Sequence, residues 1–515
     1  MRATALLLAT LVSAVAYGLC FPPGGLRALG FGALIPFLVA IRRAGRVGAL
    51  LLAWLWTVVA AYAVGDWFPW SVSTYYQQPI VIGIAFFAGV SSIMAAPYFV
   101  AFAACYRAMA RTRWATLPLC VAAAWAGAEW CRTTFLTGNP WALFGYSQGG
   151  VGVLLQIADI TGVYGVSFVL VAVNAALAEA WLAARSNDHS ARQAIGGLRL
   201  AGLALAVVVG YGVVRLGSAP PAEPPSSGVK IGIIQGNLDL GSQWRQEFYG
   251  RNLDVYMGLT LQALRAEKPA LVFWPESAMT FFLDDEPLYR SALGRILAPS
   301  NAQLIAGAPR FTGSRDDPQY YNTAFLLSPK GEILGWYDKQ RLLPFAEYFP
   351  VRSLDFLRRR FARVREFTPG VSDSLLPTPA GMAGIVICNE AVFPEIPAAR
   401  VRAGSAYLVN LANDTWVSDT KFSAQLFDIV SLRAVEQRRY LVRASTSGFS
   451  AIVDPWGRVQ AVTEPFTRAW IVGSIEGGDV LTPYCRFGDL FALTCIGLTC
   501  AVLVAGGIGA TISPS

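Results

Sequence analysis

Eight apolar stretches, each long enough to cross a bilayer as a helix, constrain this chain more than any other feature. A hydrocarbon core of about 30 Å needs roughly 20 mostly apolar residues in a helix. Seven stretches lie in the first 216 residues and one lies near the C-terminus. They cover residues 3–20, 26–42, 46–65, 79–106, 115–131, 161–184, 197–216 and 489–511. We therefore predict a polytopic α-helical membrane domain of about eight transmembrane helices, seven of them within residues 1–216.

The composition also indicates an integral membrane protein. Hydrophobic residues make up 54% of the chain and charged residues only 14%, whereas charged residues make up about 25% of a typical soluble domain. The first apolar stretch is long and no small-residue cleavage site follows it. We therefore expect it to be retained rather than removed as a signal peptide.

The arginines between the predicted spans indicate the orientation of the chain in the membrane. Arg2 and the arginine-bearing segments 42–46, 107–113 and 185–199 fall on one side, whereas the loop 66–78 has no Lys or Arg. Cytoplasmic loops are enriched in these residues, so we place the N-terminus in the cytoplasm and residues 217–488 outside it. This bias accounts for much of the net charge of +8, and we expect no nucleic-acid partner.

A Pro- and Ser-rich linker, residues 217–228, precedes a segment of different character, residues 229–488. In this segment short β-rich runs alternate with helical stretches such as 245–267 and 421–439. The runs are VKIGIIQ, ALVFWPE, QLIAGAP, TAFLLS, GIVIC and AYLVNLAN. The alternation predicts one α/β layered domain, and the last helix falls in residues 489–515.

Three residues of the outer domain are suited to acyl transfer: Glu276, Lys339 and Cys388. The only histidine is His189, so a mechanism that needs a histidine near them is excluded, and we expect no metal or other cofactor. A thiol then needs a carboxylate base, and Glu276 follows an apolar strand where a dry site would raise its pKa. Lys339 and backbone N–H groups near Asn389 would stabilise an oxyanion. Taken singly, each residue is more often structural or solvated.

Two of the eight cysteines lie in the outer domain, Cys388 and Cys485. The other six lie in or beside the predicted spans, where a thiol behaves as a small hydrophobe. A disulfide between Cys388 and Cys485 is the less favoured alternative, because Cys388 ends an apolar run and is followed by Asn389 and Glu390.

The Glu, Lys and Cys, in this order, resemble the carbon-nitrogen hydrolase, or nitrilase, superfamily. That resemblance implies an αββα sandwich that acts on amides or esters, with a second Glu beside the Lys, which Glu347 in PFAEY matches. A nitrilase-like domain with seven spans before it and one after it resembles the bacterial apolipoprotein N-acyltransferase family. Further matching segments are EWCRTTFLTGNPWALFGYSQ (129–148), QIADITGVYGVSF (156–168), QGN (235–237), RAVEQRRYLVRASTSGFSAIVDPWG (433–457) and RFGD (486–489). The chain departs from the usual pattern at Ala346, Asn389 and Val417-Ser418.

The family resemblance implies a two-step reaction at the outer face of the bacterial inner membrane. Glu276 takes the proton of Cys388, the thiolate attacks a phospholipid acyl ester, and Lys339 stabilises the oxyanion. The thioester then acylates the α-amine of the diacylglyceryl-cysteine of an apolipoprotein. The expected partners are a phospholipid donor, a diacylated apolipoprotein acceptor and the membrane. Glu347 and Glu390 are expected to orient Lys339 and the nucleophile loop.

Several side chains are candidates to contact lipid. The candidates to line a lipid entrance are Phe281, Phe282, Phe345, Tyr348, Phe349 and Trp416, although core packing explains each of them equally well. Glu129 and Arg132, at the end of a span, would either bind a lipid head group or form a structural ion pair.

Two other functions compete with acyl transfer. A membrane-tethered amidase or nitrilase-type hydrolase would use the same three residues with water as the acceptor, but tethering needs only one span. A non-catalytic scaffold or transporter is less favoured. Transporters usually carry internal repeats and membrane-buried charges, and the sequence indicates neither apart from Glu129 and Arg132.

Overall fold

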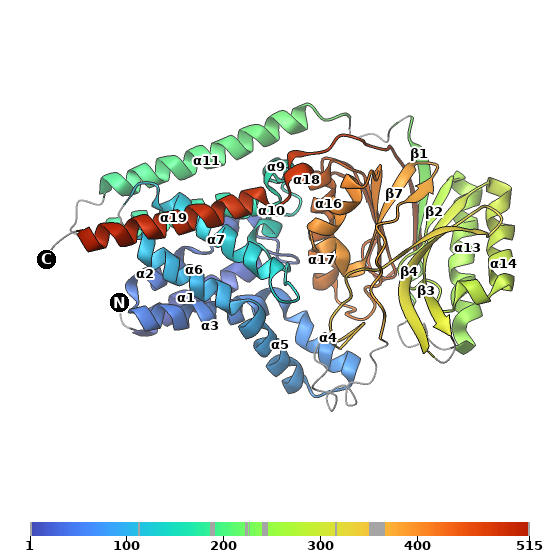
Figure 1. Cartoon of the computed structure of the whole chain (residues 1–515), viewed down its shortest axis with the longest axis horizontal. Helices are drawn as coiled ribbons and strands as arrows, with labels where there is room; N and C mark the ends of the chain where they lie inside the picture. Colours follow the sequence, from blue (N-terminus) through green and yellow to red (C-terminus); the bar gives the residue numbers. More distant parts are fainter. Residues whose placement is uncertain are drawn as a thin grey trace. The chain divides into compact units, whose positions relative to one another are not determined.

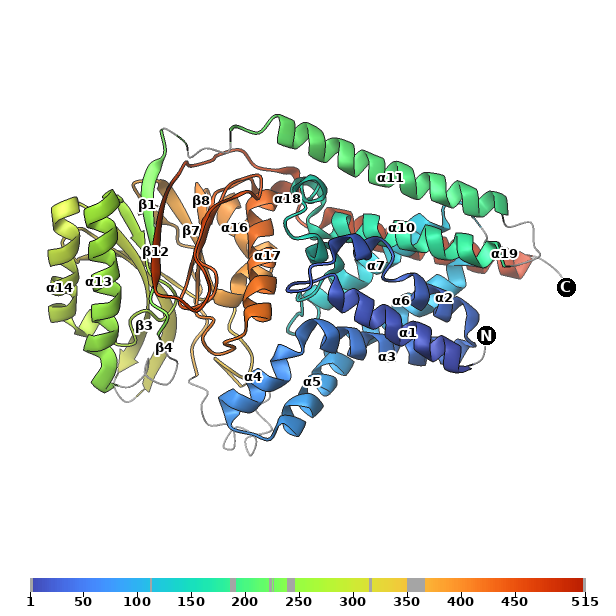
Figure 2. The same ribbon diagram turned by 180° about the vertical axis from the view of Figure 1, so that it is seen from behind.

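The structure is a computed structural model that describes residues 3–111, 114–185, 191–221, 225, 227–238, 246–314, 317–349 and 366–512. The chain forms two compact units (Figures 1 and 2). The first, the membrane unit, comprises Met1–Ala219 and Phe487–Ser515, and the second, the outer unit, comprises Pro220–Arg486.

The membrane unit is helical. Its longer helices are α1 (Ala3–Leu19), α2 (Ile35–Arg43), α3 (Arg46–Gly65), α4 (Trp67–Tyr76), α5 (Ile80–Met94), α6 (Ala96–Met109), α7 (Leu117–Thr134), α10 (Val163–Ala183), α11 (Ala191–Gly217) and α19 (Leu490–Ile512). Short helical turns lie between them: η1 (Arg27–Phe31), η2 (Phe144–Gln148), α8 (Gly152–Leu155) and α9 (Ala158–Thr161). A buried aromatic cluster joins several of the long helices, with Trp56 of α3 in ring contact with Phe37, Phe99 and Trp125.

The predicted helical membrane domain is confirmed, but the number of crossings is only approximate. Among the described residues, three helices are long and apolar enough to span a bilayer, α3, α10 and α11, and the bent pair α5 and α6 makes a fourth if it is one span. The predicted span 26–42 is wrong as a single helix: η1 is followed by a nine-residue α2 that begins at Ile35 and has Pro36 in its first turn. Proline is tolerated in the first turn of a helix, where its missing N–H group would have no partner within the helix.

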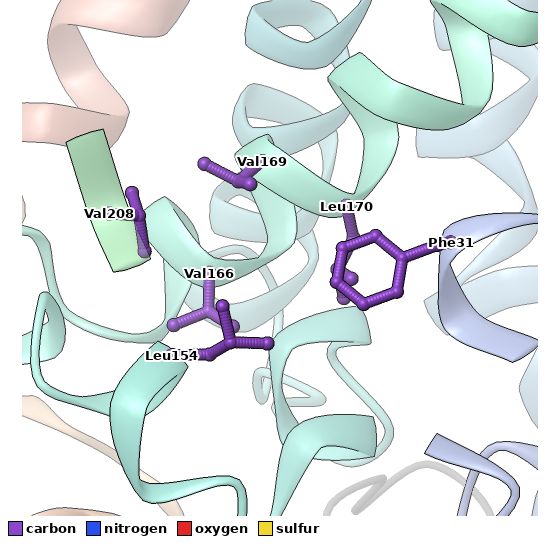
Figure 3. Close-up of a pocket in the computed structure, with 6 residues that line it drawn as sticks. All are labelled: Phe31, Leu154, Val166, Val169, Leu170 and Val208. Atoms are coloured by element: carbon purple, nitrogen blue, oxygen red, sulfur yellow. The ribbon is translucent and has the colours of Figure 1, made fainter. Parts of the chain in front are cut away.

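One apolar crevice of the membrane unit lies between η1, α8, α10 and α11 (Figure 3). Six apolar side chains line it: Phe31, Leu154, Val166, Val169, Leu170 and Val208. The space between them is too narrow for a water molecule. The crevice is therefore a packing feature of the bundle rather than a ligand cavity.

The outer unit contains two six-stranded sheets, in the orders β12-β1-β2-β3-β4-β5 and β11-β10-β9-β8-β7-β6. The strands of the first sheet are β1 (Val229–Gln235), β2 (Leu271–Phe273), β3 (Gln303–Ser314), β4 (Asp317–Leu327), β5 (Ile333–Asp338) and β12 (Ala469–Ile475). The strands of the second sheet are β6 (Leu376–Thr378), β7 (Gly381–Ile387), β8 (Tyr407–Ala412), β9 (Leu441–Ser445), β10 (Ala451–Val453) and β11 (Val459–Val462).

Helices cover the outer face of each sheet, so the predicted αββα sandwich is confirmed. Figure 1 shows α13 (Tyr249–Glu267) and α14 (Pro287–Leu297) along the first sheet, and α16 (Glu395–Arg402) and α17 (Thr420–Gln437) along the second. Apolar residues of both sheets, such as Phe273, Ile305 and Ile385, form the core between them. The layers form because alternate strand residues face the opposite sheet and the helices.

Parallel pairing at the centre of each sheet determines where functional side chains can gather. In the first sheet β1, β2 and β3 run parallel, and in the second β7, β8 and β9 run parallel. The carboxyl ends of parallel strands meet at one edge of a sheet, which is where open α/β sheets bind ligands. Residues that follow β2, β7 and β8 are therefore brought to such edges.

Candidate active site

The structure brings together the three residues predicted to perform chemistry. Glu276 follows β2, Lys339 directly follows β5, and Cys388 directly follows β7 as the first residue of the 3₁₀ turn η7 (Cys388–Val392). All three are buried, with exposed fractions of 6%, 1% and 8% respectively. The site is therefore dry, and interactions between its charges are stronger than they would be in water.

The ammonium group of Lys339 lies between two carboxylates. Its Nζ is 2.8 Å from Glu347 Oε2 and 3.6 Å from Glu276 Oε1. The side-chain amide of Asn322 on β4 donates to the same two residues, at 2.7 Å to Glu276 and 2.9 Å to Glu347. One lysine and one amide thus hold both carboxylates in place, and Asn322 was not identified from the sequence.

The carboxylate of Glu276 is also fixed on its other side. Its Oε2 accepts the backbone N–H of Asn413, which follows β8, at 2.8 Å. Its backbone packs directly on Gly307 of β3, where an added Cβ would lie 2.7 Å from the Glu276 Cα. Only glycine leaves room for this approach. The orientation of Glu276 is therefore set by contacts from β3, β4 and the end of β8.

Burial and the charges of the site shift the pKa values of all three residues. Burial raises the pKa of Glu276, although Lys339 opposes this rise. Burial, followed by the negative charge of Glu276, raises the pKa of Cys388 well above that of an ordinary thiol. Burial disfavours the charged form of Lys339, but the carboxylates of Glu347 and Glu276 outweigh it and raise the pKa of the lysine. Near neutral pH the site thus holds a protonated thiol, a cationic lysine and a carboxyl group adapted to accept a proton.

The backbone of Cys388 adopts an unusual conformation. Its φ of 53° lies in the left-handed region, which a non-glycine residue rarely adopts. The side-chain amide of Asn410 on the neighbouring strand β8 donates to the carbonyl groups of Val386, at 3.1 Å, and of Cys388, at 3.3 Å. Asn410 therefore fixes two peptide groups where β7 ends and the turn that carries the thiol begins.

A buried ion pair supports Asn410. Arg443 on β9 donates to the side-chain oxygen of Asn410 and, at 2.9 Å, to Asp414 Oδ2. The side chains of Arg443 and Asp414 are both fully buried. Ser445 donates to the same Asp414 oxygen at 2.9 Å. Three residues beneath the thiol thus form one hydrogen-bonded chain from Asp414 through Arg443 to Asn410.

Glu390 connects the loop that carries Cys388 to the loop that carries Lys339. One of its oxygens accepts the backbone N–H of Ile387 at 2.7 Å. The other accepts the backbone N–H groups of Gln340, at 2.7 Å, and Arg341, at 3.1 Å, and the hydroxyl group of Tyr337 at 2.9 Å. Glu390 is fully buried, and burial raises its pKa.

The remaining predicted residues of the outer unit lie in the surrounding loops. Asn389 follows the thiol, and its buried Oδ1 has no hydrogen-bond partner among the described residues. Phe345 and Tyr348 lie on either side of Glu347, and the Phe345 N–H donates to the Tyr348 carbonyl at 2.7 Å. The ring of Trp416 packs against Phe422 of α17 at 5.6 Å.

Glu129 and Arg132 belong to α7 of the membrane unit and are buried there. Glu129 Oε1 accepts from the indole of Trp125 at 3.0 Å and from the backbone N–H of Phe144 at 2.7 Å. The guanidinium of Arg132 lies 5.6 Å from the ring centre of Phe99. Glu129 Oε2 and two nitrogen atoms of Arg132 are buried with no hydrogen-bond partner in the described part of the chain.

Three further features bear on the predicted chemistry. Cys388 and Cys485 are both free thiols, so the alternative disulfide is not formed. His189 lies outside the described residues. Within the described ranges, His, Cys, Asp and Glu side chains form no group of three that could hold a metal ion.

Comparisons with known proteins match the two units separately. The family described as "Apolipoprotein N-acyltransferase N-terminal domain" matches residues 13–176. The family described as "Carbon-nitrogen hydrolase" matches residues 230–480. Among solved structures, the outer unit is similar to a variant of the amidase from Nesterenkonia sp. AN1, with 18% identity and a TM-score of 0.38, covering 52% of this chain and 97% of that chain.

Curated proteins match nearly the whole chain. The apolipoprotein N-acyltransferase of Geobacter metallireducens is 35% identical over 496 residues, which cover 95% of this chain and 93% of that protein. The enzyme of the same name from Pseudomonas putida is 31% identical, over 95% of this chain and 98% of that protein. The one from Caulobacter vibrioides is 30% identical, over 98% of this chain and 96% of that protein. These matches extend over both units.

Proposed function

The chain belongs to the apolipoprotein N-acyltransferase family, and on this premise we propose that it transfers a fatty acyl chain from a membrane phospholipid to a lipoprotein. The acceptor is the α-amine of the N-terminal diacylglyceryl-cysteine of an apolipoprotein. The observation that carries the proposal is the buried constellation of Cys388, Lys339 and Glu276, in which the carboxylate of Glu276 lies beside the thiol and the ammonium group. The proposed location is the bacterial inner membrane, with the outer unit on the periplasmic side.

The first half-reaction forms an acyl-enzyme. Glu276 accepts the proton of the Cys388 thiol as the sulfur attacks the ester carbonyl of the phospholipid. Lys339 and the backbone N–H groups near Asn389 stabilise the oxyanion of the tetrahedral intermediate. The intermediate collapses, the C–O bond breaks, and the lysophospholipid leaves with the proton that Glu276 returns. The acyl chain remains on Cys388 as a thioester.

The second half-reaction consumes the thioester. The amine of the diacylated acceptor attacks the thioester carbonyl, and Glu276 takes the amine proton. The C–S bond breaks, the amide product leaves, and the thiolate recovers the proton from Glu276. The burial of the site protects the thioester from water between the two steps. The proposed transferase and the competing hydrolase therefore differ in whether an amine or water discharges the thioester.

The other residues of the site have proposed supporting roles. Glu347 orients Lys339, and its 2.8 Å contact with the ammonium supports this role. Glu390 positions the nucleophile loop against the lysine loop through four hydrogen bonds. Phe345, Tyr348 and Trp416 are proposed to contact lipid. Glu129 and Arg132 are proposed to contact a lipid head group, supported by their buried polar atoms that lack hydrogen-bond partners among the described residues.

Mass spectrometry of the purified protein tests the mechanism. Incubated with phospholipid alone, the protein should gain one acyl group on the peptide that contains Cys388, and hydroxylamine should release it. Cys388→Ala should gain nothing, whereas Cys485→Ala, which removes a second buried free thiol of the same unit, should be acylated at the wild-type rate. Adding a diacylated lipopeptide should discharge the adduct into triacylated product. Discharge to free fatty acid at the same rate without lipopeptide would instead establish the hydrolase.

A further inference from the structure

Three aromatic side chains form an aromatic ledge beside the catalytic carboxylates: Phe282, Phe311 and Tyr320. The ring centre of Phe282 lies 5.0 Å from that of Phe311 and 5.8 Å from that of Tyr320, with which it stacks. Tyr320 is 38% exposed and the other two are half-buried. The rings thus pack on one another and still present apolar surface outside the core.

Strand register places the aromatic ledge next to the active site. In the antiparallel pair of β3 and β4, Phe311 is opposite Tyr320, Pro309 is opposite Asn322, and Gly307 is opposite Ala324. Residues two apart on a strand share one face and lie about 6.8 Å apart. Asn322 holds both carboxylates. Tyr320 is two residues from Asn322 on β4, so the aromatic ledge begins about 7 Å beyond Asn322 on the same face of the sheet.

Farther along β3 and β4, the same face of the sheet bounds the core between the two sheets. Ile305 on β3 and Ala324 on β4 belong to that core. Ile305 is an even number of residues from Phe311, and Ala324 is an even number of residues from Tyr320. Residues at such spacing are on the same face of a strand. The core residues are buried, whereas Tyr320 is exposed. The inner apolar face of the first sheet thus continues past the catalytic carboxylates and ends as an accessible aromatic surface.

The opposite face of the same hairpin has a different character. Arg310 pairs with Asp338 there and packs against the rings of Tyr321 and Trp336, at 4.6 and 5.3 Å from their centres. Trp336 is 47% exposed. An exposed aromatic ring of similar size therefore lies on the same sheet but on the face away from Asn322, and it provides a matched control.

We propose that the aromatic ledge binds the acyl chain that the enzyme transfers, and that it determines the preference of the site for long chains. This inference rests on the proposed function. The acyl chain is covalently attached to the carbonyl that Cys388 attacks, so it must leave the reacting atoms along an apolar surface. The ledge offers such a surface within a few methylene groups of the carboxylate base, and burying aliphatic chain against it is favourable.

The test compares two phospholipids that differ only in chain length, dipalmitoyl- and dihexanoyl-phosphatidylglycerol, in the same detergent micelles. The rate of thioester formation on Cys388 is measured with the full-length protein, and the ratio of the long-chain to the short-chain rate is the readout. Phe282→Ala and Tyr320→Ala should each lower this ratio by about tenfold, because apolar contacts of this size discriminate substrates by roughly 10-fold to 200-fold. Tyr320→Phe, which keeps the ring, and Trp336→Ala should keep the wild-type ratio.

The possible outcomes separate the inference from the function on which it rests. If both alanine variants keep the wild-type ratio and the wild-type protein forms the thioester, the proposed role of the aromatic ledge is wrong, whereas the proposed function is not contradicted. An equal fall in the ratio for Trp336→Ala would also overturn it, because that ring is on the other face. If the wild-type protein forms no thioester with either phospholipid, the proposed function fails and the ledge fails with it. Tyr320 is exposed, so its replacement leaves the core intact and keeps the test available if Phe282→Ala does not fold.

Discussion

The side-chain amide of Asn410 donates to the carbonyl group of Cys388 at 3.3 Å, so a residue of β8 holds the turn that follows β7. Arg443 in turn donates to Asn410, and Asp414 neutralises Arg443. The left-handed backbone of Cys388 is costly, of order 1–3 kcal/mol, and persists only when its surroundings impose it. The chain from Asp414 to Asn410 is the structural reason that it persists here.

We predict that Arg443→Met lowers both stability and acylation. It leaves the Asp414 carboxylate buried without a cation, which costs about 3–5 kcal/mol. The double variant Arg443→Met/Asp414→Leu should recover most of the stability, because replacing both members of a buried pair by apolar groups is nearly neutral. Its acylation of Cys388 should stay slow, because Asn410 has still lost its anchor. Chemical denaturation and thioester formation are the two measurements.

The control is an exposed ion pair in the same unit. Lys230 and Glu267 lie 3.2 Å apart and are each 47% exposed. Lys230→Ala should therefore change stability by less than about 1 kcal/mol and leave acylation unchanged. Full recovery of acylation in the double variant would contradict the positioning role of Arg443.

The second prediction concerns Gly307. Gly307→Ala places a methyl group 2.7 Å from the Glu276 Cα and equally close to the Pro275 carbonyl and the Ser277 N–H. The backbone must shift, so acylation should fall at least 100-fold, the cost expected when a catalytic group is misplaced by about 1 Å. Gly258→Ala, in the middle of α13 with open space around the added methyl group, should instead raise stability by roughly 0.5–1 kcal/mol with acylation unchanged. Equal activity of the two variants would contradict the contact.

The sequence predicts the strands that lead to Glu276 and Cys388, because a continuous apolar run followed by a polar residue is typical of the end of a buried strand. It does not predict Asn322, Asn410 or Asn413. The register of β4 on β3 and of β8 on β7 decides whether an Asn within or after a strand reaches the site. That register is set by contacts distant in sequence.

The sequence does not predict the pairing of β12 with β1 for the same reason. The paired positions, from Gln235↔Ala469 to Val229↔Ile475, are 234 to 246 residues apart in the chain. The average apolarity of segment 26–42 predicts a single helix, but it does not show where a helix is interrupted. There the chain forms η1, a short connection and then α2, which begins near Pro36.

The third prediction concerns Lys339. Lys339→Met removes the cation that opposes the rise in the pKa of Glu276. It also removes the proposed oxyanion donor, and loss of such a donor typically costs about 10²- to 10³-fold in rate. Acylation should fall by at least that factor, and the remaining rate should require a higher pH than in the wild type, because the pKa of Glu276 rises further. Lys330→Met, at an exposed lysine of the turn after β4, should keep the wild-type rate and pH profile. An unshifted profile for Lys339→Met would contradict the coupling.

The last prediction separates proton transfer within the site from a thiolate that exists beforehand. Because the pKa of Glu276 is raised, acylation should fall as pH decreases through that raised value, above the ordinary glutamate pKa of about 4.3. Below it the carboxyl group is protonated and cannot accept the thiol proton. Above it the base is free and this dependence disappears.

Glu276→Gln should then have opposite effects on two reactions of Cys388. Acylation by phospholipid should fall about 10²- to 10⁴-fold, because the general base is lost. Alkylation by iodoacetamide at a fixed pH near 8 should become faster, because the negative charge that helps to raise the pKa of Cys388 is gone and more thiolate forms. Both rates are measured on the Cys485→Ala background, and Cys388→Ser defines unspecific labelling. If Glu276→Gln did not speed up alkylation, the prediction that the negative charge of Glu276 raises the pKa of Cys388 would be wrong.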